Sequence, residues 1–149
     1  MTQTSAFHRP RLLVVGCGDV GMRLLPLIAP RFRVFALTSQ PERREELRAA
    51  GAVPVVADLD RSATLGRLRG LADWVLHLAP PQPEGDIDRR TRRLVAALGG
   101  VKRLVYVSTT GVYGDCGGER VLESRKVAPR NARALRRVDA ERVLRAWAL

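Results

Sequence analysis

The chain has 149 residues, of which 46% are hydrophobic and 28% charged, and its formal net charge is +11. This length and composition suit one domain with a buried core and argue against disordered, low-complexity and collagen-like chains. No apolar run approaches the roughly 18 to 20 residues of a membrane span. Residues 1–10 lack the order of a secretory signal, and two cysteines are too few for a disulfide scaffold or a four-ligand zinc site. We therefore expect a cytoplasmic protein without a membrane segment or a metal site.

The positive charge comes almost entirely from arginine, because Lys102 and Lys126 are the two lysines among 26 cationic residues. A surplus of this size favours polyanionic partners, which include nucleic acid, acidic lipid and phosphorylated cofactors. The alternative is that the arginines are scattered over helix faces and are simply solvated.

Apolar runs and helix signals alternate along the chain. In order, the pattern predicts a strand at 11–15, a helix at 22–29, a strand at 33–37, a helix at 41–50, a strand at 53–57, a helix at 62–68, a strand at 73–78, a helix at 87–98, a strand at 103–108 and a helix at 132–147. Such alternation is typical of βαβ units with right-handed crossovers. We predict a single α/β domain over residues 1–149, with a doubly wound parallel sheet of about five strands flanked by helices, as in Rossmann-type folds.

The segment after the first predicted strand fits the pattern G-x-G-x-x-G and opens a helix. In a βαβ unit, Gly16 would permit the tight turn, Gly18 would admit a pyrophosphate close to the backbone, and Gly21 would let the helix pack closely on the strand. The helix N-terminus then favours an anion. We therefore predict a dinucleotide-binding loop, in which Cys17 is a small filler rather than a reactive thiol. The alternative is a strand–helix turn without a ligand. The residues that complete the loop are Asp19 and Val20.

The end of the second predicted strand bears on the choice of dinucleotide. NAD-binding Rossmann domains place an acidic residue there for the ribose 2′-hydroxyl, whereas this chain has Thr38 and Ser39, followed by Arg43. With no carboxylate to repel a 2′-phosphate, and with a guanidinium to bind it, NADP is favoured over NAD. The alternative is that Arg43 and the adjacent Arg44 only pair with Glu42 or Glu46 on the helix surface.

Four segments together resemble the extended short-chain dehydrogenases/reductases of the NAD-dependent epimerase/dehydratase kind. They are residues 16–21, 57–59, 75–79 and 105–115, the last being a strand followed by a hydroxyl cluster and Val-Tyr-Gly. The resemblance extends from Arg11 to about Leu144. It implies adenine contacts from Asp58 and Leu59, and a ribose and nicotinamide wall of Leu78, Ala79 and Pro80. It further implies that Ser108 lies beside the cofactor, that Thr109 is the catalytic hydroxyl residue, and that Arg137 holds a ribose hydroxyl.

The sequence departs from this family at its acid/base pair. The family pattern is Tyr-x-x-x-Lys-x-x-x-Glu, and with Glu141 as the anchor this chain has Arg133 and Arg137 at the tyrosine and lysine places. Arginine stays protonated at all relevant pH and cannot transfer the proton. We therefore expect an NAD(P)-binding protein related to oxidoreductases and epimerases whose activity is weak or absent.

Family members also continue with a further strand and a substrate-binding region, to about twice this length, which this sequence lacks. The small-molecule substrate is therefore not predicted. The chain is either a truncated fragment or one whose fold a partner completes, and a sheet that ends at the fifth strand predicts a homodimer or a poorly soluble species. An alternative function is a non-enzymatic NADP(H) sensor or scaffold. Nucleic-acid binding through the arginine-rich C-terminal helix is a distant third, and no specific binding is expected because the usual signatures are missing. His77 is interpreted as a hydrogen-bonded core residue.

Overall fold

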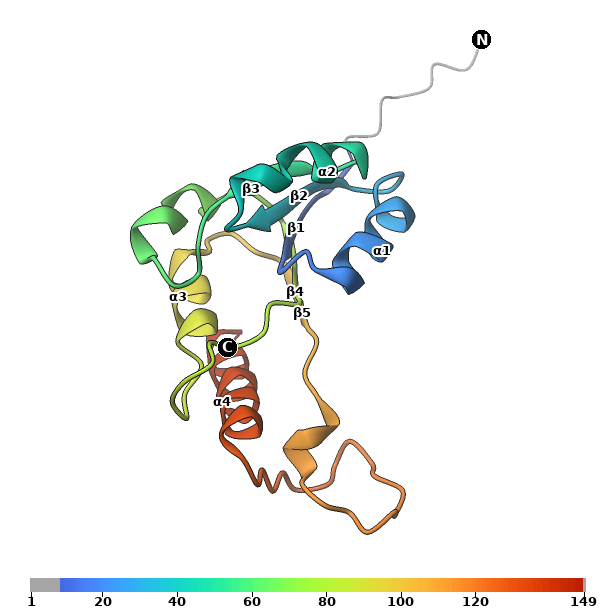
Figure 1. Cartoon of the computed structure of the whole chain (residues 1–149), viewed down its shortest axis with the longest axis vertical. Helices are drawn as coiled ribbons and strands as arrows, with labels where there is room; N and C mark the ends of the chain where they lie inside the picture. Colours follow the sequence, from blue (N-terminus) through green and yellow to red (C-terminus); the bar gives the residue numbers. More distant parts are fainter. Residues whose placement is uncertain (1–8, 149) are drawn as a thin grey trace.

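The computed structural model describes residues 9–148 (Figure 1). The predicted strands form one sheet of five parallel strands in the order β3-β2-β1-β4-β5, which confirms the Rossmann-type α/β fold. The first eight residues, on which part of the expectation about a secretory signal depends, lie outside the described range. The strands are β1 (Arg11–Val15), β2 (Arg33–Thr38), β3 (Val53–Val56), β4 (Trp74–His77) and β5 (Arg103–Tyr106).

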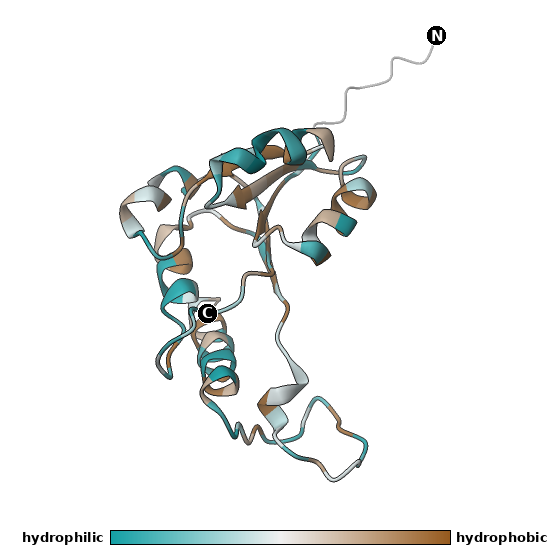
Figure 2. Ribbon diagram, in the orientation of Figure 1, coloured by the Kyte–Doolittle hydropathy of each residue, from teal (hydrophilic) through white to brown (hydrophobic). Residues whose placement is uncertain are grey.

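The central strand β1 is apolar from Leu12 to Val15 because both faces of the sheet are covered there. Leu13 and Val15 belong to the core on one face, whereas Leu12 and Val14 belong to the core on the other. A continuous apolar run is what a strand buried on both sides requires. Figure 2 shows the strands as brown, hydrophobic segments between helices of mixed colour.

Two layers of helices cover the sheet. One face is covered by α1 and α2, which contribute the fully buried Leu25 and Leu47, and the other by η2, α3 and α4, with Leu65 and Leu94 in its core. The helices are α1 (Asp19–Ile28), α2 (Arg44–Ala49), α3 (Arg89–Ala97) and α4 (Ala132–Trp147), with 3-10 turns η1 (Pro41–Arg43), η2 (Ser62–Leu68) and η3 (Thr110–Tyr113).

Several predicted helix boundaries were wrong, and local capping explains two of them. The first helix begins at Asp19 rather than at residue 22, because the carbonyl of Gly18 already accepts a hydrogen bond from the amide of Met22 at 2.8 Å. The fourth begins at Arg89 rather than at residue 87, because the Asp88 carboxylate caps it. The helix predicted at 41–50 is divided into η1 and α2, and the one predicted at 62–68 is a 3-10 helix.

Two strands form the edges of the sheet. β5 pairs with β4 alone among the described strands; Val105 on β5 is 55% exposed, and Val107, which follows the strand, is 49% exposed. The opposite edge strand, β3, contains Pro54, which has no amide proton to offer a further strand. A cavity of about 450 Å³ lies between β5 and the end of α4, with Trp147 in its wall. The β5 edge is thus better suited than the β3 edge to pair with a further strand.

The last helix is attached to the sheet through a long connection. Residues 107–131 contain the single short helix η3, and Figure 1 shows this segment at the end of the molecule remote from β3. α4 then returns to lie beside α3, where Asp139 pairs with Arg92 at 2.6 Å. Arg136 on α4 donates to the carbonyl of Gly85 at 2.6 Å. Side-chain contacts therefore hold α4 in place.

Within residues 9–148, no helix has the combination of length and apolarity that crossing a membrane demands. The same residues contain no group of three or more His, Cys, Asp or Glu placed to hold a metal ion.

Candidate functional site

The glycine loop makes a close contact with the end of β4. Gly16 has a φ of +88°, and a Cβ there would lie 2.5 Å from the Cα of Ala79, so a side chain cannot be accommodated. Gly18 faces open space, with no atom within 4 Å of its position for a Cβ. A Cβ on Gly21 would meet the Sγ of Cys17 at 3.0 Å. The first helix therefore packs closely on the loop itself, and of these three glycines Gly18 has open space at its Cβ position.

A cavity of about 410 Å³ opens in front of this loop, at the carboxyl ends of β1, β2 and β4. In open α/β sheets this crevice is the usual place for a ligand, and the N-terminus of α1 adds a favourable field for an anion. Most of the residues predicted for the glycine loop and for the choice of dinucleotide line this cavity. Its walls are Gly16, Cys17, Gly18, Asp19, Val20, Leu37, Thr38, Ser39, Gln40, Arg43, Leu78 and Pro80.

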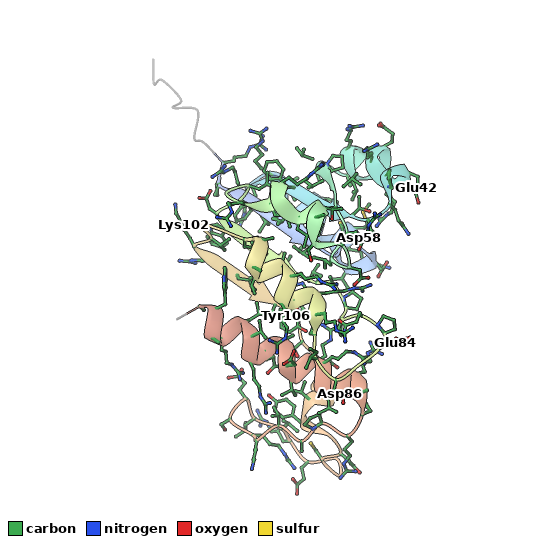
Figure 3. The ribbon with its side chains drawn as sticks, turned by 90° about the vertical axis from the view of Figure 1, so that its left-hand side faces the viewer. Glu42, Asp58, Glu84, Asp86, Lys102 and Tyr106 are labelled. Atoms are coloured by element: carbon green, nitrogen blue, oxygen red, sulfur yellow. The ribbon has the colours of Figure 1, made fainter. Side chains whose placement is uncertain are left out.

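A smaller cavity of about 130 Å³ continues from the first and shares four wall residues with it. It lies beside the segment that follows β3, where Asp58 is labelled in Figure 3. The predicted adenine contacts, Asp58 and Leu59, line it together with Ala79. The full set is Gly16, Leu37, Thr38, Ser39, Ala57, Asp58, Leu59, Ala79 and Arg90. The two cavities form one elongated site across the ends of four strands.

Arg43, the last residue of η1, connects this turn to the glycine loop. Its Nη1 donates to the carbonyl of Cys17 at 2.7 Å, and its Nε pairs with a carboxylate oxygen of Glu46 at 2.8 Å. The pairing proposed as the alternative interpretation is therefore present, but in addition to a contact with the loop. The hydrogen bond from Arg43 lowers the pKa of Glu46 and raises that of Arg43. Within the described range Nη2 of Arg43 donates no hydrogen bond, and the residue lines the larger cavity.

The hydroxyl groups at the end of β2 differ in availability. Thr38 is buried, and its Oγ1 accepts a hydrogen bond from the amide of Gln40 at 3.1 Å. Ser39 is exposed and lines both cavities.

Burial raises the pKa of the Cys17 thiol, against a smaller opposing effect of the Arg43 charge. This supports the interpretation of Cys17 as a neutral filler of the loop.

Three further predicted residues lie at the end of β5, outside both cavities. Ser108 donates to Oε1 of Glu141 on α4 at 2.6 Å. Thr109 is exposed, and its Oγ1 accepts a hydrogen bond from the amide of Gly111 at 3.3 Å, which begins η3. Arg137 is 8% exposed and donates to the Tyr106 hydroxyl at 2.9 Å and to the carbonyl of Val107 at 3.1 Å. In this structure the Arg137 guanidinium thus contacts protein groups at the strand end.

A buried polar cluster lies behind the end of β5. Nε2 of His77 is 2.8 Å from Oγ1 of Thr91, which donates to the Asp88 carboxylate at 2.8 Å, so the predicted core role of His77 is confirmed. The Tyr106 ring lies 5.0 Å from that of His77, and Figure 3 places Tyr106 between α3 and α4. Burial raises the pKa of Tyr106, and the neighbouring Arg137 opposes the change. A phenol with a raised pKa is a poor substitute for the missing acid/base tyrosine.

Arg90 is a wall residue that no sequence motif revealed. It lies in the first turn of α3, two residues after the capping Asp88, and no motif marks it. Its side chain reaches the smaller cavity because α3 begins beside the segment that follows β3. Leu37, Gln40 and Ala57 also line the site, as neighbours of the predicted residues.

Comparison with known proteins agrees with this geometry. A family model described as NAD(P)H-binding matches residues 16–149. Among solved structures, a functionally unknown conserved protein from Silicibacter pomeroyi shares 29% identity, with a TM-score of 0.67 over 92% of this chain and 48% of that one. A short-chain dehydrogenase/reductase superfamily protein from Agrobacterium tumefaciens with bound NAD shares 22% identity (TM-score 0.72, 91% and 44%). UDP-glucuronic acid 4-epimerase from Bacillus cereus, in complex with UDP-glucuronic acid and NAD, shares 19% (TM-score 0.72, 92% and 52%).

The similarities to the last two structures, at 22% and 19% identity, establish a shared fold. The chain spans about half the length of the solved structures it matches. No curated protein sequence matches it. The family model covers most of the chain, and the elongated site follows a glycine loop at the carboxyl edge of a parallel sheet. The chain therefore belongs to the NAD(P)H-binding family, with the Rossmann-type fold of its neighbours among the short-chain dehydrogenases/reductases and epimerases/dehydratases.

Proposed function

We propose that this chain binds NADP(H) in preference to NAD(H), with the pyrophosphate at the glycine loop and the 2′-phosphate beside Arg43. The observation that carries the proposal is the position of Arg43, in the wall of the larger cavity and bonded to the carbonyl of Cys17. The adjacent strand end offers Ser39 and no carboxylate. A guanidinium held in this way recognises phosphate with charge-assisted hydrogen bonds.

Calorimetric titration with NADPH, NADP⁺ and NAD⁺ at two salt concentrations tests this proposal. We expect NADPH to bind more tightly than NAD⁺, and Arg43→Ala to weaken NADPH binding roughly 10- to 100-fold, since a hydrogen bond to a charged group contributes about 1.5 to 3 kcal/mol. NAD⁺ binding should change little. Arg44→Ala is the matched control, because Arg44 is adjacent, exposed and outside the cavity wall. Equal losses in both variants, or tighter binding of NAD⁺ by the wild type, would contradict the proposal.

We propose that proton transfer of the usual family kind is weak or absent. Arg133 occupies the tyrosine place and is exposed. Arg137 donates hydrogen bonds to the Tyr106 hydroxyl and the Val107 carbonyl. Any carbonyl reduction would then depend on Thr109 to orient the substrate oxygen, with the proton supplied by water or by the substrate. The bound cofactor would supply hydride chemistry. The exposed arginine at the tyrosine place favours a second candidate, a non-enzymatic NADP(H)-sensing or scaffold protein. Measurable turnover of a carbonyl substrate would count against that candidate.

We also propose that the β5 edge mediates a homodimer. Val105 is exposed on this edge, whereas Pro54 disfavours pairing at the other. Light scattering of the purified chain should show a dimer, which Val105→Lys converts to a monomer because a charge on an edge strand opposes pairing. The matched control is Val53→Lys on β3, where the native side chain is 42% exposed. A monomeric wild type, or a dimer that persists in Val105→Lys, would refute the arrangement.

A further inference from the structure

Arg90 lies where two loops of the candidate site meet. It lies in the first turn of α3 and lines the smaller cavity, and its side chain is 24% exposed. The same cavity has apolar walls at Leu37, Ala57 and Ala79, and a volume of about 130 Å³. Arg90 is the cationic residue in this wall.

The guanidinium of Arg90 is fixed by protein groups on three nitrogens. Nε is 2.9 Å and Nη2 2.5 Å from the two carboxylate oxygens of Asp60, which follows β3. Nη1 donates to the carbonyl of Pro80, which follows β4, at 3.2 Å. The hydrogen bond from Arg90 lowers the pKa of Asp60, so this two-point pair is fully ionised at neutral pH. Arg90 therefore bridges the two loops between which the cavity lies.

This bonding leaves a particular surface of Arg90 for a ligand. Three of the five N–H donors already have acceptors, so one N–H on each Nη and the planar face of the group remain for further contact. A guanidinium face stacks on aromatic rings, and a group already held in place loses little conformational freedom on binding. The cavity shares four wall residues with the one in front of the glycine loop, so a ligand that binds at the loop can extend into it.

We propose that Arg90 stacks on the adenine base of the bound dinucleotide, and that its bridge from Asp60 to Pro80 sets the width of the adenine pocket. The inference rests on the proposed cofactor site and adds a base-recognition residue to it. Arg93, one helical turn further along α3, offers a close comparison. Its Nη1 lies 3.7 Å from Asp60 and donates to the carbonyl of Leu59 at 3.2 Å, but it does not line this cavity.

The test compares wild type, Arg90→Gln, Arg90→Lys and the control Arg93→Gln by titration with NADPH, 2′,5′-ADP and reduced nicotinamide mononucleotide. Thermal unfolding of each variant verifies its fold. We expect both Arg90 variants to lose roughly 3- to 30-fold in affinity for the two adenine-containing ligands, in the range of cation–π interactions. The mononucleotide, which lacks adenine, should bind all four proteins equally, and Arg93→Gln should behave as wild type.

The outcomes separate this inference from the proposed function. Unchanged binding of 2′,5′-ADP by Arg90→Gln would overturn the stacking role, and so would recovery by Arg90→Lys, which keeps the charge without the planar face. Equal losses in Arg93→Gln would show a merely structural effect on α3 and would also overturn it. If Arg90→Gln does not fold, Arg90→Lys decides the question alone. Failure of the wild type to bind NADPH and 2′,5′-ADP would refute the proposed function instead.

Discussion

Replacing Gly16 by alanine is expected to lower the free energy of unfolding by roughly 3 kcal/mol or more. Two costs combine at this position. The backbone has a φ of +88°, which side chains other than glycine's hydrogen rarely adopt, and the new Cβ would overlap the backbone of Ala79. The Ala79 backbone, which follows the inner strand β4, cannot move aside as the tip of a side chain can. Urea unfolding followed by circular dichroism measures the loss.

Gly18→Ala is the matched control in the same loop. Its Cβ would meet no atom within 4 Å, and the φ of −84° suits alanine. We expect stability close to that of the wild type, but weaker binding of NADPH, because the methyl group would stand where the pyrophosphate approaches. A stable Gly16→Ala protein would show that the loop can move away from β4. Unaltered binding by Gly18→Ala would contradict the proposed position of the pyrophosphate.

Acidification from pH 6.5 to pH 4 should lower the free energy of unfolding by about 3 kcal/mol through His77. Burial, with a smaller contribution from the Arg137 charge, lowers the pKa of His77 from 6.5 to about 4. Between these values the unfolded chain binds a proton that the folded chain does not. Stability therefore falls as the pH falls through this window, and His77 contributes no such loss above pH 6.5. Urea titrations at pH 7, 5.5 and 4.5 measure the slope.

His77→Gln isolates this contribution, because glutamine can keep a hydrogen bond to Thr91 but does not titrate. The variant should show a flatter dependence on pH than the wild type between pH 6.5 and 4.5. Asp60 and Asp73 have pKa values lowered by their cationic partners, so they lose their contribution at still lower pH. Identical slopes in the two proteins would show that His77 becomes protonated without unfolding.

The strands were predictable from the sequence because each is a short apolar run with a turn at its end. β1, for example, is buried on both faces and needs no alternation, and its run stops at Gly16. Helix ends were less predictable, since single hydrogen bonds decide them. The Asp88 carboxylate accepts from the amide of Thr91 at 3.0 Å, and this bond places the start of α3. Composition and periodicity carry little information about such a choice.

In the candidate site, too, local sequence patterns were predictable and contacts between distant residues were not. The glycine loop is a local pattern, so its position after β1 followed from spacing within one βαβ unit. The contact of Arg43 with the Cys17 carbonyl joins residues 26 positions apart, and the Arg90–Asp60 pair joins residues 30 apart. Both depend on which loops the strand order places together. Only the folded sheet reveals them.

The long connection before α4 has a consequence for how this helix is held. Residues 107–131 contribute one short 3-10 helix, whereas Asp139, Arg136 and Arg137 fasten α4 to α3 and to the segments that follow β4 and β5. The first residues of this connection dock α4, since the Val107 carbonyl accepts a hydrogen bond from Arg137 and Ser108 donates one to Glu141. Residues 114–131, which contain no helix or strand, act mainly as a tether that gives α4 a high effective concentration at its docking site. Cleavage within the tether would convert the docking of α4 into a bimolecular equilibrium. Occupancy of that site would then depend on protein concentration, although every docking contact would be unchanged.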